Sequence, residues 1–478
     1  MPSFLGKPIW WGSPAHQLFT VIVFVILASL DNAARGVLPP LYAVVSRDLQ
    51  VSEAALGMVT GVTVIALSVT SVGWGYWGDR RARKPLLFYG TLIWVAGMGL
   101  TGQAATFKQL FLWQLVAAVG IGCIASVGFS VISDLIPAGR RGMMLGFWGI
   151  SQGGGAGLGA LLGGSLGAYE WPLPFFGVAA AGLLFALLYL FTFEPERGRA
   201  EPELVPLFEA GRTYDHRISR ADLRRLWAVT SNRWLLLVAF VGPLAYGSRV
   251  WLARLFIAKV EAGGYSLETA TITGNMFSLL FETGFYFAIL SGYLGDRWQR
   301  HNPRGRARLG MGLVWLAIPF QIVVFLMPLR NLNFPTEANV PTLTGAVLWS
   351  LVSNPWVGST FLVALLAIAL LAGDSPTRAA LYTEVNLPEH RGTVTGFMTI
   401  ATGLGLALGN WLAGLTISSL AHFYAPPLNY ALGLALFQLW LIPAGWCYYQ
   451  ISKSVAEDLA RLKRTLSLRA ESEPDPFT

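Results

Sequence analysis

Charged side chains are scarce in this chain of 478 residues: they make up 13% of it, whereas hydrophobic residues make up 54%. An average soluble protein carries roughly a quarter of its residues as charged side chains. The low charge, with a mean hydropathy of +0.54, excludes a soluble globular protein. It favours an all-α polytopic membrane protein, because about 20 apolar residues in a helix cross a bilayer core about 30 Å thick.

Cysteine and histidine are also rare, and their positions exclude two further classes of protein. The two cysteines, Cys123 and Cys447, lie inside apolar runs, so a disulfide framework is excluded and we expect two small buried residues. The five histidines lie at span ends or in loops, and the chain has no His-Glu-x-x-His motif and no spaced Cys/His cluster. We therefore expect no metal, no cofactor and no enzymatic activity.

Apolar runs of spanning length are abundant, and twelve can be placed. They cover residues 18–40, 54–76, 86–106, 110–133, 143–167 and 172–193, then 235–257, 269–292, 309–329, 355–382, 393–418 and 428–450. A polar, Arg-rich stretch separates six spans from six. The sequence predicts an N-terminal six-helix bundle (1–193), a cytoplasmic linker (194–234), a C-terminal six-helix bundle (235–450) and a cytoplasmic tail (451–478).

Two amphipathic segments lie outside the predicted spans. In the linker, Ser219 and Asp222 have the spacing of a capping box, and apolar residues follow on one side of a short helix. In the tail, apolar residues recur at helical intervals, at Val455, Leu459, Leu462 and Leu466. We expect both helices to lie on the membrane surface, and a disordered acidic end to follow the second.

The basic residues gather on one side of the predicted topology. With twelve spans, 26 of the 34 Lys and Arg residues fall on the side of the two termini. Short loops rich in Lys and Arg remain in the cytoplasm. We therefore expect a multi-pass protein of the cell (inner) membrane with both termini cytoplasmic, and a pI of about 9.5 that reflects topology and not nucleic-acid binding.

The two halves of the chain repeat each other. Gly75-Tyr-Trp-Gly-Asp79-Arg80 recurs 217 residues later as Gly292-Tyr-Leu-Gly-Asp296-Arg297, and Asp134, Arg141-Gly142 and several glycines recur at an offset of 250 residues. The difference of 33 residues belongs to an insertion between spans nine and ten, which we expect to form an external loop over 330–355. Two similar six-helix halves joined by a polar linker are the layout of a secondary transporter, whose site lies between the halves.

The first copy of the repeated motif carries a family resemblance. Gly75-Tyr-Trp-Gly-Asp79-Arg80-Arg-Ala-Arg83-Lys84 resembles the signature of the major facilitator superfamily, with Ala82 where the family has Gly. The resemblance implies twelve helices in two pseudo-symmetric halves and a cytoplasmic gate, in which Asp79 accepts from a helix N-terminus and the arginines pair with carboxylates. The gate residues are Gly75, Gly78, Asp79, Arg80, Arg83, Gly292, Gly295, Asp296 and Arg297.

Span five is similar to the antiporter signature of the same superfamily, with Ala160 in place of its Pro. Glycines at four-residue spacing also let any two membrane helices approach closely. An export-specific role and simple helix packing therefore both remain open. We assign a helix-packing role to Gly155, Gly159, Gly163, Gly405 and Gly409.

Within the superfamily, three stretches of the first half resemble the spinster-like lipid transporters: 30–39, 75–84 and 193–198. Spinster proteins carry an acid in span one that is thought to take the coupling proton, and the resemblance assigns this role to Asp31. Asn32 replaces the Arg that follows that acid, although Arg35 lies one turn on. Gln114 and Ile121 stand where the family has Arg and Glu in span four.

Ionisable residues inside spans are costly and mark a pathway by default. Asp31 and Arg249 lie at one level, roughly 20 Å and roughly 21 Å from the starts of their spans, so we expect them to face each other across a central cavity. Glu282 is a second candidate for proton coupling.

The other polar residues within the spans divide into two groups. Arg35, Asn32 and Gln152 join Arg249 as candidate substrate-binding residues. Asp374 and Arg378 are four residues apart and can neutralise each other on one helix face, and Arg254 can extend to the outer interface.

These features predict a secondary active transporter that works by alternating access, coupled to protons or another ion. Its expected substrate is a small or amphiphilic organic solute, either lipid-like or anionic. Two alternatives are a polytopic membrane enzyme that acts on lipid and a transporter-like sensor that binds without transport. We expect membrane lipid, the solute and the coupling ion as partners, no nucleic acid, and a monomer.

Overall fold

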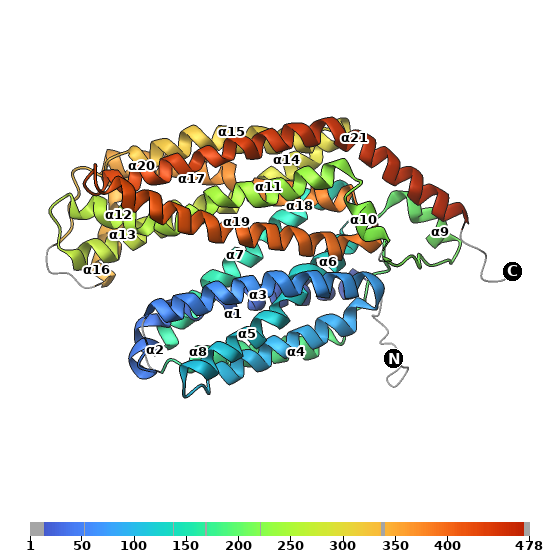
Figure 1. The fold of residues 1–478 in the computed structure, drawn as a ribbon, viewed down its shortest axis with the longest axis horizontal. Helices are drawn as coiled ribbons and strands as arrows, with labels where there is room; N and C mark the ends of the chain where they lie inside the picture. The colour runs from blue at the N-terminus through green and yellow to red at the C-terminus, as the bar shows by residue number, and fades with distance from the viewer. Residues whose placement is uncertain are drawn as a thin grey trace.

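A computed structural model describes residues 14–51, 53–136, 138–167, 170–219, 221–335 and 340–472, and within these ranges the chain is helical and contains no β-strand. The helices lie side by side along the long axis of the molecule (Figure 1). The described chain starts and ends at the same end of the molecule (Figure 1). We refer to this end as the base and to the opposite end as the far end.

The first half of the chain forms the N-terminal bundle. Its six spanning segments are α1 (Pro14–Gly36), α3 (Glu53–Arg80), α4 (Arg83–Thr101), α5 (Phe107–Cys123) with α6 (Phe129–Leu135), α7 (Arg141–Leu166) and α8 (Leu173–Tyr189). A π-helical turn, Ile124–Gly128, joins α5 to α6, and a short helix, α2 (Tyr42–Asp48), follows α1 at the far end.

The second half forms the C-terminal bundle, in which four of the six segments are interrupted. The segments are α11 (Thr230–Gly247) with α12 (Leu252–Glu261), α13 (Leu267–Phe281) with α14 (Ala288–His301), α15 (Gly305–Leu326), α17 (Pro355–Ala372) with α18 (Asp374–Glu384), α19 (Arg391–Leu420), and α20 (Leu428–Phe437) with α21 (Leu441–Ser472). The interruptions of the first two segments are 3₁₀ turns, Ser248–Trp251 and Thr283–Phe287.

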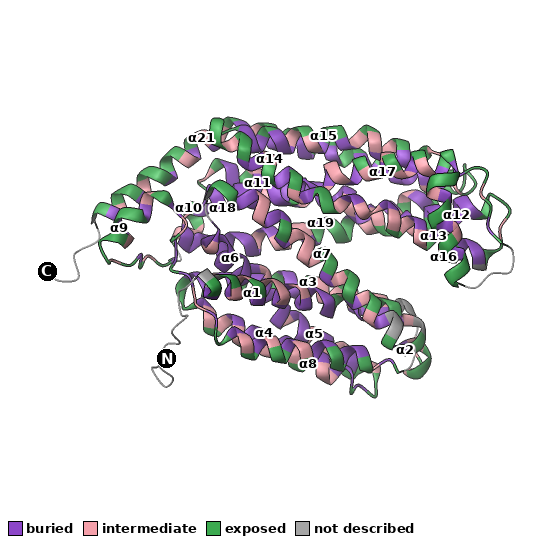
Figure 2. Ribbon diagram, turned by 180° about the vertical axis from the view of Figure 1, so that it is seen from behind, coloured by how far each residue is buried: buried purple, intermediate pink, exposed green. Residues whose placement is uncertain are grey.

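The prediction of an all-α fold with twelve spanning segments is confirmed, because a helical segment occupies each of the twelve apolar runs. Nine helices in the described ranges are by themselves long and apolar enough to cross a membrane. Exposed residues line the outer faces of both bundles, and buried ones lie between the helices (Figure 2). Large apolar side chains such as Leu161 and Leu279 are among the exposed ones, as expected where lipid and not water is the solvent.

Glycines let equivalent helices of the two halves pack closely. Gly155 and Gly159 of α7 lie against backbone carbonyl oxygens of α1, and Gly405 and Gly409 of α19 lie against those of α11. Gly163 of α7 lies against the carbonyl oxygen of Val37, directly after α1. A Cβ atom at any of these positions would overlap the facing carbonyl group. Because only glycine permits this approach, the stripe has a sufficient explanation in helix packing.

The expected capping-box pair, Ser219 and Asp222, forms in the turn that leads into the linker helix α10 (Asp222–Leu226). The Ser219 backbone N–H donates to Asp222 Oδ2 at 2.9 Å, and the Asp222 N–H donates to Ser219 Oγ at 3.3 Å. This reciprocal pair satisfies two of the free N–H groups at the helix N-terminus.

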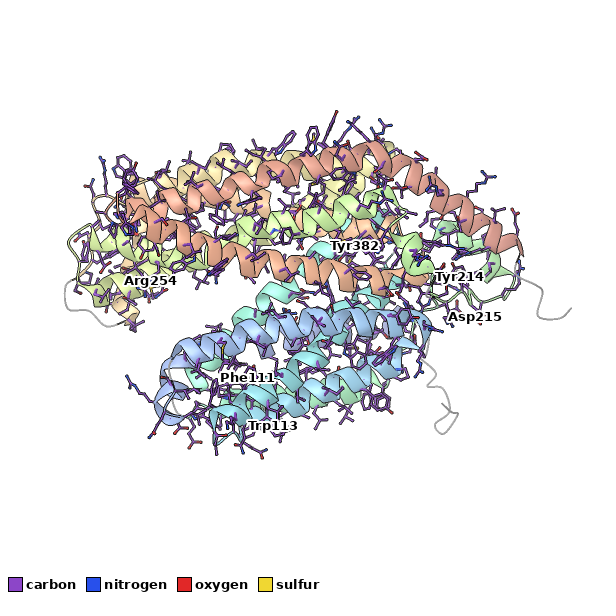
Figure 3. All side chains as sticks on the ribbon, viewed as in Figure 1. Phe111, Trp113, Tyr214, Asp215, Arg254 and Tyr382 are labelled. Atoms are coloured by element: carbon purple, nitrogen blue, oxygen red, sulfur yellow. The ribbon has the colours of Figure 1, made fainter. Side chains whose placement is uncertain are left out.

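The tail is helical, as predicted, but its apolar stripe packs on the linker and not on the membrane surface. It continues α21 to Ser472, and the apolar stripe with Leu462 and Leu466 packs against the linker residues Leu204, Leu207 and Tyr214. Figure 3 shows Tyr214 at the base beside this helix. The apolar stripe thus has a protein partner. The acidic end, 473–478, lies outside the described residues.

The loop expected over 330–355 contains a further helix, α16 (Val340–Ser353), which packs against α13 and α17. Its apolar residues Leu343 and Val347 are buried there. The apolar run in this insertion is therefore part of the far end of the C-terminal bundle. Residues 336–339 of the loop are not among those described.

Candidate functional site

The two bundles meet along two pairs of helices, α3 with α19 and α7 with α14. On α3, Gly75 lies against the carbonyl group of Gly392, and Ser68 lies against Gly403. Further toward the far end on the same face, a Cβ atom placed on Gly61 would meet nothing within 4 Å. The bundles are therefore in contact from the base to the middle of the molecule and diverge toward the far end (Figure 1).

Asp79 of the N-terminal bundle holds the first turn of α19 in the C-terminal bundle. Its Oδ1 accepts from the Gly392 N–H at 3.0 Å and its Oδ2 from the Thr393 N–H at 2.6 Å. Arg197 Nη1 lies 3.6 Å from Oδ1. The side chain is fully buried. A carboxylate in this position satisfies two free N–H groups and is stabilised by the helix dipole.

Asp296, in the second copy of the motif, makes the same contact in the opposite direction. Its two oxygens accept from the Gly142 N–H at 2.7 Å and the Met143 N–H at 2.8 Å, at the start of α7. Arg306 Nη2 lies 2.9 Å from Asp296 Oδ1. Each bundle therefore caps a helix of the other.

The arginines of the motif do not all take part in this contact. Arg83 is buried and pairs with Asp134 of the same bundle at 2.5 Å and with Glu194, the first residue of the linker, at 3.5 Å. Arg80 and Arg297, which the sequence placed in the gate, are exposed, and Arg80 donates to the Tyr76 hydroxyl. The motif glycines Gly78 and Gly295 lie against side chains of their own bundles.

The counterpart of the Arg83–Asp134 pair was missed from the sequence. In the C-terminal bundle, Arg306 pairs with Glu384 at 2.8 Å. The repeat offset of 217 residues points to Arg300 instead, which is exposed and donates to the Gly139 carbonyl at 2.8 Å. Only the structure identifies Arg306 as the counterpart of Arg83. Arg306 is the second residue of α15, and Arg83 is the first residue of α4.

A linker carboxylate lies between the two bundles at the base. Arg141 and Arg391, the first residues of α7 and α19, both donate to Glu201 Oε1, and all three side chains are buried. Burial raises the pKa of the Glu201 carboxyl, but the charges of Arg141 and Arg391 outweigh it and hold the pKa at about 2. Arg391 also pairs with Asp134 at 3.0 Å.

On the N-terminal side of the centre, Asp31 is 2% exposed on α1. Its Oδ1 has no hydrogen-bond partner among the described residues. Asn32 donates to the Ala28 carbonyl at 2.8 Å and accepts from the exposed Arg35. Gln152, the other polar candidate of this bundle, is half-buried on α7.

On the opposite side, Arg249 pairs with Glu282 and not with Asp31. Its Nε donates to Glu282 Oε1 at 3.0 Å, and the two side chains also form an ion pair through Nη2 and Oε2. They remain 20% and 32% exposed. The sequence predicts Asp31 and Arg249 at one level, but the two side chains are not paired in this conformation, since equal depth does not fix the direction in which a side chain points.

The remaining charged residues of the spans are Asp374, Arg378 and Arg254. Asp374 is fully buried, accepts from the Tyr448 hydroxyl at 2.5 Å and lies 3.5 Å from Arg378 on its own helix. Arg254 is exposed on α12 toward the far end (Figure 3).

Arg249, Glu282 and Asp374 share one structural feature: each lies where a spanning segment is interrupted. Arg249 is in the turn between α11 and α12, Glu282 directly follows α13, and Asp374 begins α18. Interrupted spanning helices commonly form the substrate and ion sites of secondary transporters. The centre of the molecule is therefore the candidate site.

The amino-acid sequence of this chain is similar to those of known membrane proteins. A sequence profile of the Major Facilitator Superfamily matches residues 24–330. The chain is 24% identical to protein spinster homolog 3 of Mus musculus, over 87% of this chain and 78% of that protein.

Two solved structures share the fold. A bacterial homologue of the human lysosomal transporter Spinster, inward-facing and unoccupied, superposes with a TM-score of 0.57 at 20% identity, over 94% of this chain and 99% of that one. The fucose:proton symporter FucP of E. coli superposes with a TM-score of 0.60 at 16% identity, over 92% and 99%.

Proposed function

This multi-pass membrane protein belongs to the major facilitator superfamily of secondary transporters, and we propose that it couples the movement of an anionic amphiphile to the movement of protons. Charge balance at the centre is the observation that carries the proposal. Leaving aside the exposed Arg254 and the charged residues at the base and at the far end, the spanning segments carry three acids and three arginines: Asp31, Glu282 and Asp374, with Arg35, Arg249 and Arg378. With all six ionised, the centre is neutral.

Asp31 is the proposed proton-binding residue. A buried carboxylate with an unpartnered oxygen is costly, and a proton on that oxygen removes the charge. Protonation of Asp31 then leaves the centre with one positive charge in excess. A solute with one negative group restores the balance, so solute and proton bind together. The likeness to a fucose:proton symporter is consistent with such coupling.

Arg249 is the proposed anchor for the anionic group. Its planar guanidinium suits the two oxygens of a carboxylate or phosphate, and it remains partly exposed beside Glu282. A bound anion would compete with Glu282 for this arginine. The resemblance of residues 30–39, 75–84 and 193–198 to spinster-like lipid transporters favours an amphiphile over a small polar solute.

The proposed orientation has both termini in the cytoplasm and the far end outside the cell membrane. In this orientation the described conformation is outward-facing. The proposed working unit is the monomer. The concentration of Lys and Arg at the base supports this orientation. Membrane-impermeant maleimide should label Asn333→Cys in intact cells, but should label Arg81→Cys only after permeabilisation. Labelling of both positions from the same side would contradict the topology.

Proteoliposomes test the coupling directly. Lysophosphatidic acid and monoacylglycerol differ by one phosphate group and form a matched pair of solutes. We expect a lysophosphatidic acid gradient to drive proton movement, reported by an internal pH dye, and monoacylglycerol to drive none. Movement of the anionic solute with no accompanying proton flux would overturn the proposal.

A further inference from the structure

The linker passes through the contact between the bundles and is not a loose connection around it. Arg197 donates through Nη2 to the Gly78 carbonyl at 2.8 Å, next to Asp79. One residue on, the Gly198 N–H donates to Asp134 Oδ1 at 3.2 Å. Gly198 has a φ of +75°, a conformation that favours glycine. This backbone conformation brings Glu201 to its two arginines.

Glu201 is the member of this segment that touches both bundles at once. Arg141 belongs to α7 and Arg391 to α19, and the internal repeat makes them equivalent residues of the two halves. One oxygen, Oε1, accepts from both. Glu201 is the only partner described for the side chain of Arg141, whose Nε is buried without a hydrogen bond in the described part of the chain.

We propose that Glu201 is a positioning residue of the transport cycle, through which the linker keeps the base closed. Alternating access requires the two bundles to separate at the base, and Arg141 and Arg391 move apart when they do. Glu201 can follow only one of them, so a buried arginine loses its partner, which is strongly unfavourable. This inference concerns the conformational equilibrium alone and stands independently of the proposed solute and of proton coupling.

Glu201→Gln removes the negative charge and leaves two neighbouring cations without it. We expect the population with an open base to rise about tenfold or more, because breaking a buried ion pair has effects of this order or larger. Glu196→Gln is the matched control, since Glu196 lies in the same linker but pairs with Arg199 on the surface. It should leave the population unchanged.

The measurement is a distance distribution between spin labels at Arg81→Cys and Arg304→Cys, which are exposed at the base of opposite bundles. Cys123 and Cys447 are replaced by alanine, and the protein is studied in lipid nanodiscs without solute. Longer distances in Glu201→Gln than in the parent and in Glu196→Gln support the proposal. An unchanged distribution, with or without a lower melting temperature, overturns it and reduces Glu201 to a structural residue.

A double variant tests whether charge is the cause. Glu201→Gln with Arg141→Gln removes the arginine that the single variant leaves unpaired, so its distances should return toward those of the parent. If the double variant is at least as open as Glu201→Gln alone, the electrostatic explanation is wrong.

Discussion

Asp79→Asn should open the base and slow the return to the closed state. In the parent, two carboxylate oxygens accept from the backbone N–H groups of Gly392 and Thr393, and Arg197 lies 3.6 Å away. Asparagine keeps one oxygen and turns an NH₂ group toward the second N–H, so one charged hydrogen bond is lost together with the attraction to Arg197.

The size of this effect follows from the number of contacts. A hydrogen bond to a charged group contributes about 1.5–3 kcal/mol, and the more distant ion pair adds a smaller amount. We therefore expect the closed base to lose about 2–4 kcal/mol, which is roughly a 30- to 1000-fold change in the equilibrium between conformations. The intrinsic affinity of each conformation for the solute should stay the same, because Asp79 lies at the base and not at the centre, so the apparent affinity should fall only by the share of the protein that leaves the solute-binding conformation.

Two assays on the same variant separate these effects. Solute exchange in proteoliposomes reports the rate of conformational change, and equilibrium binding in detergent reports the affinity. Arg80→Gln is the control from the same motif, because Arg80 is exposed and donates only to Tyr76 in the described contacts. Loss of binding with an unchanged exchange rate would place Asp79 in the binding site and refute the argument.

Three further predictions concern the centre and the linker. Asp31→Asn mimics the protonated acid, so it should keep pH-independent solute exchange but lose accumulation driven by a pH gradient; accumulation like that of the parent would place the coupling acid elsewhere, with Glu282 the next candidate. Arg249→Ala should weaken binding of an anionic solute at least about tenfold, whereas Glu282→Gln, which frees the arginine, should strengthen it; equal losses in both would contradict the role of Arg249 as anchor. The pKa of Glu201 is held at about 2, below the ordinary 4.5. The contribution of Glu201 to the stability of the closed base is therefore complete above about pH 4.5 and declines as the pH falls toward 2. Between about pH 5 and about pH 3, spin-label distances should lengthen in the parent and change less in Glu201→Gln.

The internal repeat made much of the base predictable from the sequence. Asp79 and Asp296 recur with their neighbouring glycines, and each lies at the end of a span opposite a helix N-terminus. Because both halves form the same contact, the same motif occurs at two places in the sequence. Glu201 has no such counterpart, and an acid in an Arg-rich stretch has the composition of a solvated linker. Its role depends on a backbone path that composition does not reveal.

The pairing at the centre could not be predicted from depth. Counting residues from the start of a span gives the level of a side chain, but its direction depends on continuous helical geometry. The segment that carries Arg249 changes from α-helix to a 3₁₀ turn after Gly247, and a 3₁₀ turn has a different rotation per residue. The arginine therefore points to Glu282, a partner from the next segment of its own bundle.

The proposed proton and solute residues lie in backbones of different kinds. Asp31 belongs to the uninterrupted helix α1, whereas Arg249 and Glu282 both lie at helix interruptions of the C-terminal bundle. Side chains at such interruptions can exchange partners through local backbone changes, as competition between a solute and Glu282 for Arg249 requires. Asp31 has no local freedom of this kind, so its environment changes only when neighbouring helices move. On this argument the C-terminal bundle responds to the solute directly, while the acid of the N-terminal bundle responds to the opening and closing of the base. Coupling then requires the gate residues as well as the centre, and a variant such as Asp79→Asn should slow proton and solute movement by the same factor.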